Sequence, residues 1–369
     1  MIWHIYTGSY TGAENRDGIC QFALDTDRER LRLIRTYGEM DNPSFLCLTR
    51  GFLYGVSERD RDGMVGAYRR DPVDGTLSFL GGIPTRGDAM CHLNVWPGGR
   101  FFSAANYMSG SVFTGSIRAD GSPEEVRAFC QHEGVGYYHG TKGEPRGGEQ
   151  TRWPAYLSDR QQGPHVHCTQ LSQDGKRLYV SDLGLDQIFC YEVGENAALT
   201  LAGESDQIHL PQGEGPRHFL FRREGKFLYM VAELGSKVFV YASGEDGRSW
   251  RQIQSVSTLP EGYAGENTAA ELSFSGDGRF LYVSNRGMDS LVQYEVDGNT
   301  GLLRTRDYYD TYGRCPRNFC ITPDDQYLLV ANQESGNLVL RKRDINSGEP
   351  GGKMDEVFVP QISFVTAVS

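Results

Sequence analysis

Residues 163–182, GPHVHCTQLSQDGKRLYVSD, contain the pattern that decides the fold. Apolar residues alternate on both sides of the pair Asp174-Gly175, and an Asp-Gly pair in that setting is the strongest short-range signal for a β-hairpin. The stretch is therefore predicted to form a strand, a two-residue turn and a second strand that ends on a polar residue, Asp182.

The same hairpin recurs along the chain at intervals of about 50 residues, with one longer interval between Asn106 and Asp182. Each copy continues into two further apolar runs, so that one unit holds four strands, which is the content of a propeller blade. In every copy a polar residue marks the end of the second strand; these residues are Glu58, Asn106, Asp182, Glu233, Asn285 and Asn332.

The two ends of the chain supply the remaining blade. Residues 4–8 and 19–24 look like blade strands with no opening strand before them, and residues 362–368 look like a lone strand with no partner after it. Joining the ends leaves no unpaired edge. The sequence therefore predicts an all-β fold, a seven-bladed β-propeller with four antiparallel strands per blade, whose last blade is closed by the N- and C-terminal strands, in a single domain over residues 1–369.

Composition narrows the class of partner and the compartment. A formal net charge of −11 disfavours a nucleic-acid or anionic-membrane surface, so neither partner is expected. The eight cysteines show no CxxC pair, which favours free thiols in a reducing compartment. No apolar run is long enough for a membrane helix and the first residues lack a signal-peptide layout, so a cytoplasmic protein is expected. The oligomeric state is left undetermined.

The longer interval contains an insertion at about residues 132–162, between blades two and three. It is rich in Gly, Tyr, Arg and Glu and shows no strand alternation. A long loop inside a compact repeat is often a lid or a wall over a pocket, and the alternative is a disordered insertion.

The repeat also predicts a pocket. The start of the first strand lies beside the end of the second in an antiparallel pair, so residues at these two points gather at one end of the blades. His167, Arg217, Ala270 and Arg317 occupy equivalent starting positions, with Cys91 in blade two, and Arg286 directly follows Asn285. Arginine offers a fork of donors that matches carboxylate or phosphate, so the pocket is expected to bind an anionic small molecule. The alternative is a network of ion pairs that ties the blades together.

The histidines have separate interpretations. His165 and His167 share a face of their strand and could form a metal pair, but no third ligand with suitable spacing accompanies them. His165 is instead expected to make a loop hydrogen bond, and His167, near Glu233, could act as a general acid or base. His218 is expected to point away from Arg217 and to pack between blades. His92 and Tyr107 are candidate pocket walls.

Five short motifs carry a family resemblance: PHVH at 164–167, DLG at 182–184, GPRH at 215–218, VAE at 231–233 and SNRG at 284–287. With them the chain resembles the seven-bladed propeller lactonase family, which includes bacterial propeller-type 6-phosphogluconolactonases and the fungal 3-carboxy-cis,cis-muconate cyclase. The resemblance implies a metal-independent enzyme without a cofactor. By motif it implies four catalytic residues, which are His167, Arg217, Glu233 and Arg286. The substrate-binding candidates beside them are His92, Asn106, His165, Asp182, Asn285 and Arg317.

The expected function is hydrolysis of an anionic sugar lactone, with 6-phosphogluconolactone as the first candidate. Glu233 or His167 would act as general base, while Arg217 and Arg286 would hold the anionic group and stabilise the carbonyl oxygen. Two alternatives remain open: a muconate-type cycloisomerase that takes a carboxylate substrate, and a non-catalytic propeller that binds a protein or a small metabolite.

Overall fold

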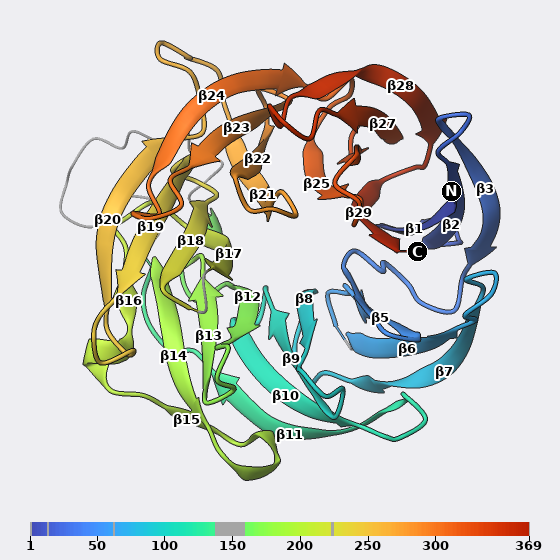
Figure 1. Ribbon diagram of the computed structural model, residues 1–369. Coiled ribbons are helices and arrows are strands. Elements are labelled where there is room, and N and C mark those ends of the chain that lie inside the picture. The colour runs from blue at the N-terminus through green and yellow to red at the C-terminus, as the bar shows by residue number, and fades with distance from the viewer. Residues whose placement is uncertain (1, 13–14, 62, 137–158, 223–224, 369) are drawn as a thin grey trace. The chain divides into compact units, whose positions relative to one another are not determined.

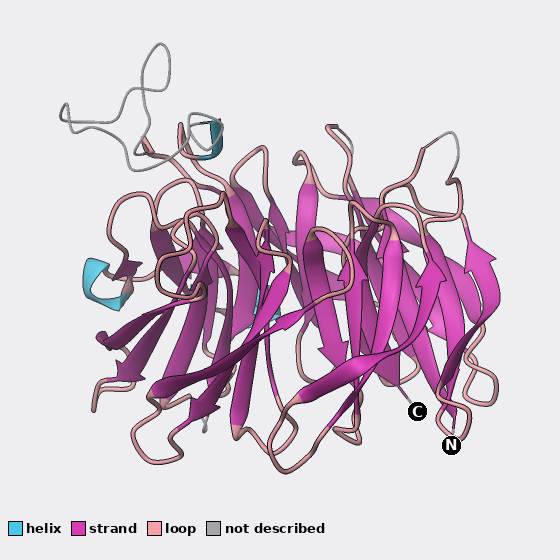
Figure 2. Ribbon diagram, turned by 90° about the horizontal axis from the view of Figure 1, so that it is seen from above, coloured by secondary structure: helices cyan, strands magenta, loops and turns pink. Residues whose placement is uncertain are grey.

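The computed structural model describes residues 2–12, 15–61, 63–136, 159–222 and 225–368. It has two compact units, one formed by Met1–Ser57, Gly66–Gly81 and Val256–Ser369 and the other by Glu58–Val65 and Gly82–Ser255. The single domain over residues 1–369 therefore stays a prediction. Strands make up almost all of the described secondary structure, as Figure 2 shows.

The first unit holds three complete antiparallel sheets, and Figure 1 labels most of their strands. Their strands are β1 (Ile2–Ser9), β2 (Ile19–Asp25), β3 (Arg30–Tyr37), β21 (Thr268–Phe274), β22 (Phe280–Arg286), β23 (Ser290–Val296), β24 (Leu303–Asp310), β25 (Pro316–Ile321), β26 (Tyr327–Asn332), β27 (Asn337–Arg343), β28 (Pro350–Phe358) and β29 (Ile362–Val368). Their orders are β29-β1-β2-β3, β21-β22-β23-β24 and β25-β26-β27-β28. A fourth sheet, mainly in this unit, has the order β4-β5-β6-β7, formed by β4 (Leu46–Thr49), β5 (Phe52–Ser57), β6 (Met64–Arg70) and β7 (Leu77–Pro84).

The second unit holds the other three sheets. Their strands are β8 (Met90–Val95), β9 (Phe101–Asn106), β10 (Ser111–Ile117), β11 (Pro123–Gln131), β12 (Val166–Leu171), β13 (Arg177–Asp182), β14 (Gln187–Val193), β15 (Leu199–Leu201), β16 (Ile208–His209), β17 (Pro216–Arg222), β18 (Phe227–Ala232), β19 (Lys237–Ser243) and β20 (Trp250–Ser257). Seven antiparallel sheets, each with a path of four strands, confirm the predicted seven-bladed β-propeller.

The sheet made from the two chain ends is also confirmed. β1 lies between β2 and β29, and Thr7 pairs with Cys20 on one side and with Val365 on the other. Buried side chains of this sheet, including Trp3 and Phe22, pack against Tyr327 and Leu340 of the neighbouring sheet in one apolar cluster. The stability of the first unit therefore depends on apolar residues from both ends of the sequence.

One blade departs from four simple strands. Its outer strand is split into β15 and β16, with the short 3-10 helix η3 (Glu204–Asp206) between them. The Gln207 side chain takes the place of the missing ladder bonds: the Cys190 N–H donates to its Oε1 at 2.7 Å, and its Nε2 donates to the Cys190 carbonyl oxygen at 3.3 Å. A side-chain amide can donate and accept as a backbone amide does, so the sheet tolerates the interruption.

A β-bulge recurs near the start of the inner strand in five blades. The register shifts between Met90 and His92, Val166 and Cys168, Pro216 and Phe219, Ala269 and Leu272, and Pro316 and Asn318. The residues inside these shifts include Cys91, His167, Arg217, Ala270 and Arg317, which are the five positions that the sequence predicted to be equivalent. A bulge inserts an extra residue and redirects its side chain, and bulges are common beside active sites.

The register of the second strands corrects one prediction. Val166 pairs with Asp182 and Pro216 pairs with Ala232, so the residue equivalent to Asp182 in the next blade is Ala232 and not Glu233. Glu233 lies one residue further along. The error arose because a polar residue was taken as the mark where the true equivalent is apolar. The shift of one residue matters because successive side chains along a strand point to opposite faces of the sheet.

The asparagines at the second-strand ends tie neighbouring segments together. Asn285 Nδ2 donates to the Thr258 carbonyl oxygen at 2.7 Å, Asn332 Nδ2 to the Thr311 carbonyl oxygen at 3.0 Å, and Asn106 Nδ2 to Ser111 Oγ at 3.0 Å. All three asparagines are fully buried. These contacts fit a structural role for this register position, since buried amides need such partners.

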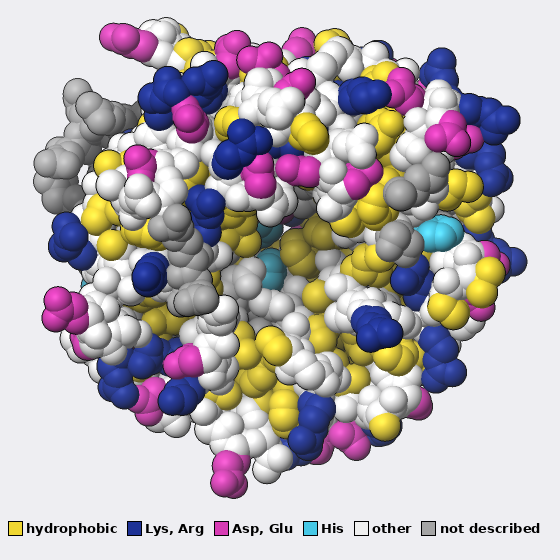
Figure 3. All heavy atoms as spheres, in the orientation of Figure 1, with side chains coloured by type: hydrophobic (Ala, Val, Ile, Leu, Met, Phe, Trp, Pro, Cys, Tyr) yellow, Lys and Arg dark blue, Asp and Glu magenta, His cyan; other side chains and the backbone are white. Residues whose placement is uncertain are grey.

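The charged side chains of the surface and the state of the cysteines agree with what the composition predicted. Figure 3 shows basic and acidic side chains interspersed over the face in view, not separated by sign. All eight cysteines lie in described segments and none of them forms a disulfide, which confirms the prediction for the thiols; Cys91, Cys168 and Cys190 are buried. Across the described residues there is no helix of the length and apolarity needed to span a membrane.

Candidate active site

A buried carboxylate, Glu233, is the centre of the candidate site. It follows the last residue of β18, and its N–H donates to the Gly215 carbonyl oxygen at 2.8 Å. Its side chain is 1% exposed. Arg217 Nε lies 3.0 Å and His167 Nε2 3.9 Å from Glu233 Oε2, while Arg160 Nη2 lies 2.7 Å from Glu233 Oε1. The structure thus brings together three of the four predicted catalytic residues and adds an arginine that was not predicted.

The repeated bulge positions two members of the cluster. His167 and Arg217 both lie inside a register shift at the start of an inner strand, β12 and β17 respectively. Glu233 comes from the end of the strand paired with β17. The cluster therefore forms because a bulged strand start and a strand end meet at the same end of an antiparallel pair.

Tyr107 and His165 support Arg160, the arginine that was not predicted. The Arg160 guanidinium lies over the Tyr107 ring at 5.3 Å, and Arg160 Nε donates to the Tyr107 hydroxyl. The His165 ring stacks on the Tyr107 ring, with 4.5 Å between the ring centroids. Burial raises the pKa of Tyr107 to about 12, so the hydroxyl keeps its proton. Arg160 is thus held between a carboxylate and an aromatic platform.

His165 makes the predicted loop hydrogen bond. Its Nδ1 lies 3.1 Å from the Tyr107 carbonyl oxygen, while its N–H donates to Asp182 Oδ1 at 2.7 Å. His165 faces Tyr107, and His167 faces Glu233, so the two imidazoles have different partners. No group of three candidate metal ligands occurs among the residues that the structure describes.

His218 does not point away from the cluster, as the strand alternation had predicted. Its ring centroid is 5.1 Å from that of His167, and Arg217 Nη1 lies 3.3 Å from its Nδ1. The bulge at Arg217 and His218 interrupts the alternation, which explains the error. The ring centroid of His92 is 5.4 Å from that of His218, and burial lowers the pKa of His92 well below its usual range. His92 is therefore a neutral support.

Asp182 is occupied by structural contacts. Its Oδ2 lies 2.7 Å from His132 Nδ1, and its Oδ1 accepts the N–H groups of His165, Gly184 and Leu185. The side chain is fully buried. Both carboxylate oxygens are thus used to fix the segment before β12 and the loop after β13. The structure gives Asp182 a positioning contact with His165.

Asp186 plays a similar part for Arg217. It accepts the Gly213 N–H at 2.8 Å, the Gly215 N–H at 2.7 Å and Gln161 Nε2 at 2.8 Å. It thereby links the end of the insertion to the loop that leads into β17. Burial raises the pKa of Asp186 to about 7.

This pKa gives a pH-dependent prediction. The folded protein holds the Asp186 proton up to about pH 7, whereas the unfolded chain loses it near pH 4. The stabilising contribution is therefore complete below about pH 4 and is lost as the pH rises through 7, at about 1.4 kcal/mol for each pH unit between the two pKa values. We expect the difference in free energy of unfolding between the natural protein and Asp186→Asn to decrease between about pH 4.5 and about pH 8.

Urea unfolding of both proteins at several pH values measures this difference. Asp246→Asn serves as the control, because the Arg248 N–H lowers the pKa of this exposed carboxyl and so moves its titration below the tested range. A flat difference for Asp186→Asn across the same range would contradict the prediction.

The remaining predicted residues belong to the first unit. Arg286 ends β22 and donates from Nη2 to the Ala269 carbonyl oxygen at 3.0 Å. Arg317 donates to the Tyr10 hydroxyl at 3.0 Å and lies over its ring. Burial raises the pKa of the Cys315 thiol, and both arginines oppose this shift, so both are near Cys315. That Arg286 joins Glu233 stays a prediction. The Asn285 side chain has three hydrogen-bond partners, which are Asn267 Nδ2, the Thr258 carbonyl oxygen and Ser290 Oγ, and its role in substrate binding stays a prediction.

The insertion is described only at its ends. Residues 137–158 lie outside the described residues, so the prediction of a lid, a wall or disorder there is untested. Residues 159–162 contribute Arg160 and Gln161 to the contacts above. No sequence signal could have found Arg160, since the insertion has no counterpart in the repeat.

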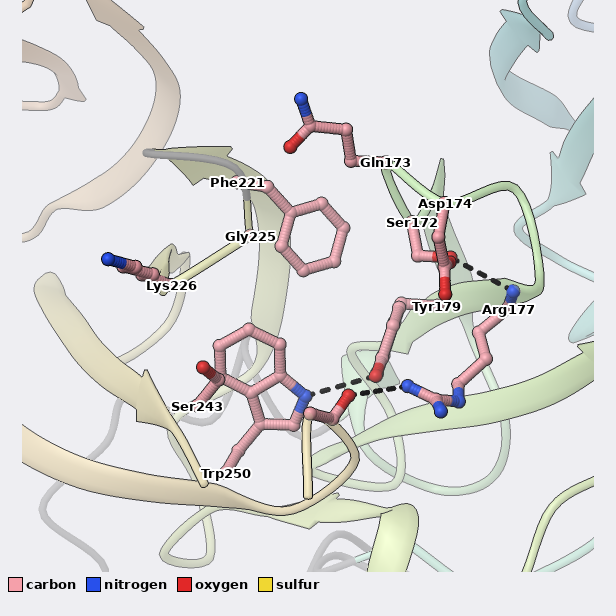
Figure 4. A pocket seen from close by; sticks show the side chains of 11 residues that line it. Ser172, Gln173, Asp174, Arg177, Tyr179, Phe221, Gly225, Lys226, Ser243 and Trp250 are labelled. Atoms are coloured by element: carbon pink, nitrogen blue, oxygen red, sulfur yellow. Dashed lines mark hydrogen bonds between the residues drawn. The ribbon is translucent and has the colours of Figure 1, made fainter. Parts of the chain in front are cut away.

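A separate pocket of about 230 Å³ lies at the turn end of the same hairpins. Figure 4 shows Trp250, Phe221 and Tyr179 around it, with Trp250 Nε1 donating to the Tyr179 hydroxyl at 3.1 Å. Arg177 and Lys226 complete its polar wall. It contains none of the predicted catalytic residues, and the strands β12, β13, β17 and β18 separate it from the Glu233 cluster.

Comparison with known proteins identifies the class. A family model described as "Lactonase, 7-bladed beta-propeller" matches residues 4–367, so the chain belongs to this family of lactonases, which are hydrolases. The predicted resemblance is confirmed.

Individual relatives are similar over nearly the whole chain. A 6-phosphogluconolactonase of Bacillus subtilis is 30% identical, with 93% of this chain and 92% of that protein covered, and one of Formosa agariphila is 30% identical, with 94% of each covered. The crystal structure of a periplasmic gluconolactonase of Pseudomonas aeruginosa is 32% identical, covers 100% of this chain and 99% of that chain, and superposes with a TM-score of 0.88.

Proposed function

We propose that this chain hydrolyses an anionic sugar lactone, with 6-phosphogluconolactone as the first candidate substrate. The family and the names of the relatives support a lactone. The observation that carries the proposal is the buried Glu233 carboxylate, which lies between Arg217 and Arg160 with His167 beside it. Two guanidinium groups and an imidazole around one carboxylate are suited to binding an anion and moving a proton.

In the proposed reaction the oxygen of a water molecule attacks the carbonyl carbon of the lactone. The water proton passes to Glu233 or His167, the ring C–O bond breaks, and the ring oxygen takes a proton to become a hydroxyl. The product is the open-chain acid. Arg217 and Arg286 hold the anionic group and stabilise negative charge on the carbonyl oxygen. The proposed reaction uses one water molecule and side chains of the protein, without a metal.

The pH dependence of kcat/KM separates the two candidate bases. An unperturbed histidine titrates near pH 6.5 and an unperturbed glutamate near 4.3. An acid limb near neutrality that disappears in His167→Gln would assign the base to His167, whereas an acid limb that persists in this variant at lower pH would assign it to Glu233.

A substrate panel tests the function itself. We expect purified protein to accelerate ring opening of 6-phosphogluconolactone above its spontaneous rate, and to leave a carboxymuconate unchanged. Turnover of the carboxymuconate without lactone hydrolysis would replace the proposal by a cycloisomerase. Binding of ligands without any turnover would replace it by a binding module.

The compartment is also part of the proposal. We expect this chain to act in the cytoplasm, although its P. aeruginosa relative is described as periplasmic. Fractionation of the source cells, followed by detection of the protein in each fraction, tests this expectation.

A further inference from the structure

We propose that Arg160 is the specificity-determining residue that selects a phosphorylated sugar lactone over the same lactone without phosphate. The inference rests on the proposed function and deepens it, because it adds Arg160 to the residues that hold the anionic group and makes Arg160 the one that distinguishes a phosphate. Arg160 lies beside Glu233 but belongs to the insertion, outside the repeated hairpins.

The first argument is the charge of the cluster. Glu233 supplies one negative charge, and Arg160 and Arg217 supply two positive charges. The two guanidinium groups and the one carboxylate therefore leave one positive charge in excess. Charges removed from water are normally paired, so a site with a surplus cation favours an anionic ligand. A phosphate monoester, which carries between one and two negative charges at neutral pH, fits this surplus.

The second argument is access. The Arg217 side chain is 4% exposed, whereas that of Arg160 is 32% exposed. Arg160 uses Nε for the Tyr107 hydroxyl and Nη2 for Glu233 Oε1. A guanidinium has five N–H donors in a planar fork, and no contact with a described residue uses Nη1, so both N–H groups of Nη1 can face a ligand. Of the two arginines on Glu233, Arg160 is therefore the more accessible to the substrate.

The third argument is preorganisation. Arg160 lies over the Tyr107 ring, Tyr107 stacks on His165, and the His165 backbone is held by Asp182. A guanidinium fixed in this way loses little conformational freedom when it binds phosphate through two parallel hydrogen bonds. The contact with Glu233 Oε1 also places the phosphate site next to the proposed general base.

The test compares 6-phosphogluconolactone with glucono-δ-lactone in the natural protein, Arg160→Met and Arg160→Lys. Both lactones lose the Arg160 contact with Glu233 in Arg160→Met, so the test is the ratio between them: we expect kcat/KM to fall about 10- to 100-fold more for the phosphorylated lactone than for the unphosphorylated one, with the extra loss mainly in KM. Arg160→Lys should recover part of the loss, because it keeps the charge without the fork. Arg118→Met is the control, since Arg118 is an exposed arginine of the same unit that pairs with Glu124.

An equal loss with both lactones would overturn the inference and show that Arg160 acts only through Glu233. No loss with either lactone would also overturn it. A separate calorimetric titration uses 6-phosphogluconate and gluconate and needs no turnover. We expect Arg160→Met to weaken only the binding of 6-phosphogluconate. If the natural protein hydrolyses neither lactone, the proposed function fails, and the same titration still supports or overturns phosphate recognition by Arg160.

Discussion

Replacement of Glu233 by Gln is expected to lower kcat by about 10²- to 10⁴-fold, the usual contribution of a general acid or base. Gln has nearly the same shape, but its single amide oxygen can accept from only one of Arg160 and Arg217, which contact different oxygens of Glu233, and it cannot take a proton from water. The same loss is expected if Glu233 orients His167, since the 3.9 Å contact then loses its charge. Steady-state kinetics with the best lactone of the panel measures the effect.

The substitution also leaves two arginines without their carboxylate, so stability must be measured beside activity. Removal of one partner of a buried ion pair costs about 3–5 kcal/mol. Asp325→Asn is the matched control, because it breaks a pair between a partly buried carboxylate and the buried Arg343 at the turn end of another hairpin. We expect the control to lose stability and to keep its activity. Normal turnover in a folded Glu233→Gln protein would remove Glu233 from the mechanism.

Replacement of Arg217 by Ala is expected to have an effect of similar size, about 10²- to 10³-fold in kcat, which is the usual loss when one donor to a developing oxyanion is removed. Arg217 is the more buried arginine on Glu233, and the bulge in β17 directs it there. Its loss removes both a partner of the carboxylate and the proposed donor to the carbonyl oxygen. Steady-state kinetics on 6-phosphogluconolactone, compared between Arg217→Ala and Arg217→Lys, is the measurement.

Arg217→Lys should keep part of the activity, because it restores the charge without the planar fork. Circular dichroism and thermal unfolding show whether either variant is folded. If Arg217→Ala stays folded and retains full turnover, and Glu233→Gln does the same, the proposed site is wrong as a whole.

Much of the fold could be predicted from the sequence because the decisive signals are local and repeated. Asp174-Gly175 and its counterparts specify hairpins, and the unmatched strands at residues 4–8 and 362–368 specify the sheet that joins the chain ends. The equivalence of His167 and Arg217 also follows from counting back from the turns, since each lies in the corresponding bulge of its own blade.

The parts of the site that could not be predicted depend on features that a repeat does not encode. Glu233 was assigned one residue out of register because its true counterpart position holds Ala232, which has no polar mark. The direction of His218 depends on a bulge that interrupts strand alternation. Arg160 comes from the insertion, where neither period nor pairing limits its position, and only the folded chain brings it to Glu233.

The sheet β29-β1-β2-β3 has a consequence for how the protein is made. During synthesis β1, β2 and β3 leave the ribosome early, and β29 follows only after all the other described strands. Until then the outer edge of β1 has unpaired backbone N–H and C=O groups, which can recruit a strand from another nascent chain. Completion of this sheet is therefore a late step, and the time before β29 arrives is the period in which the newly made chain is most exposed to misassembly.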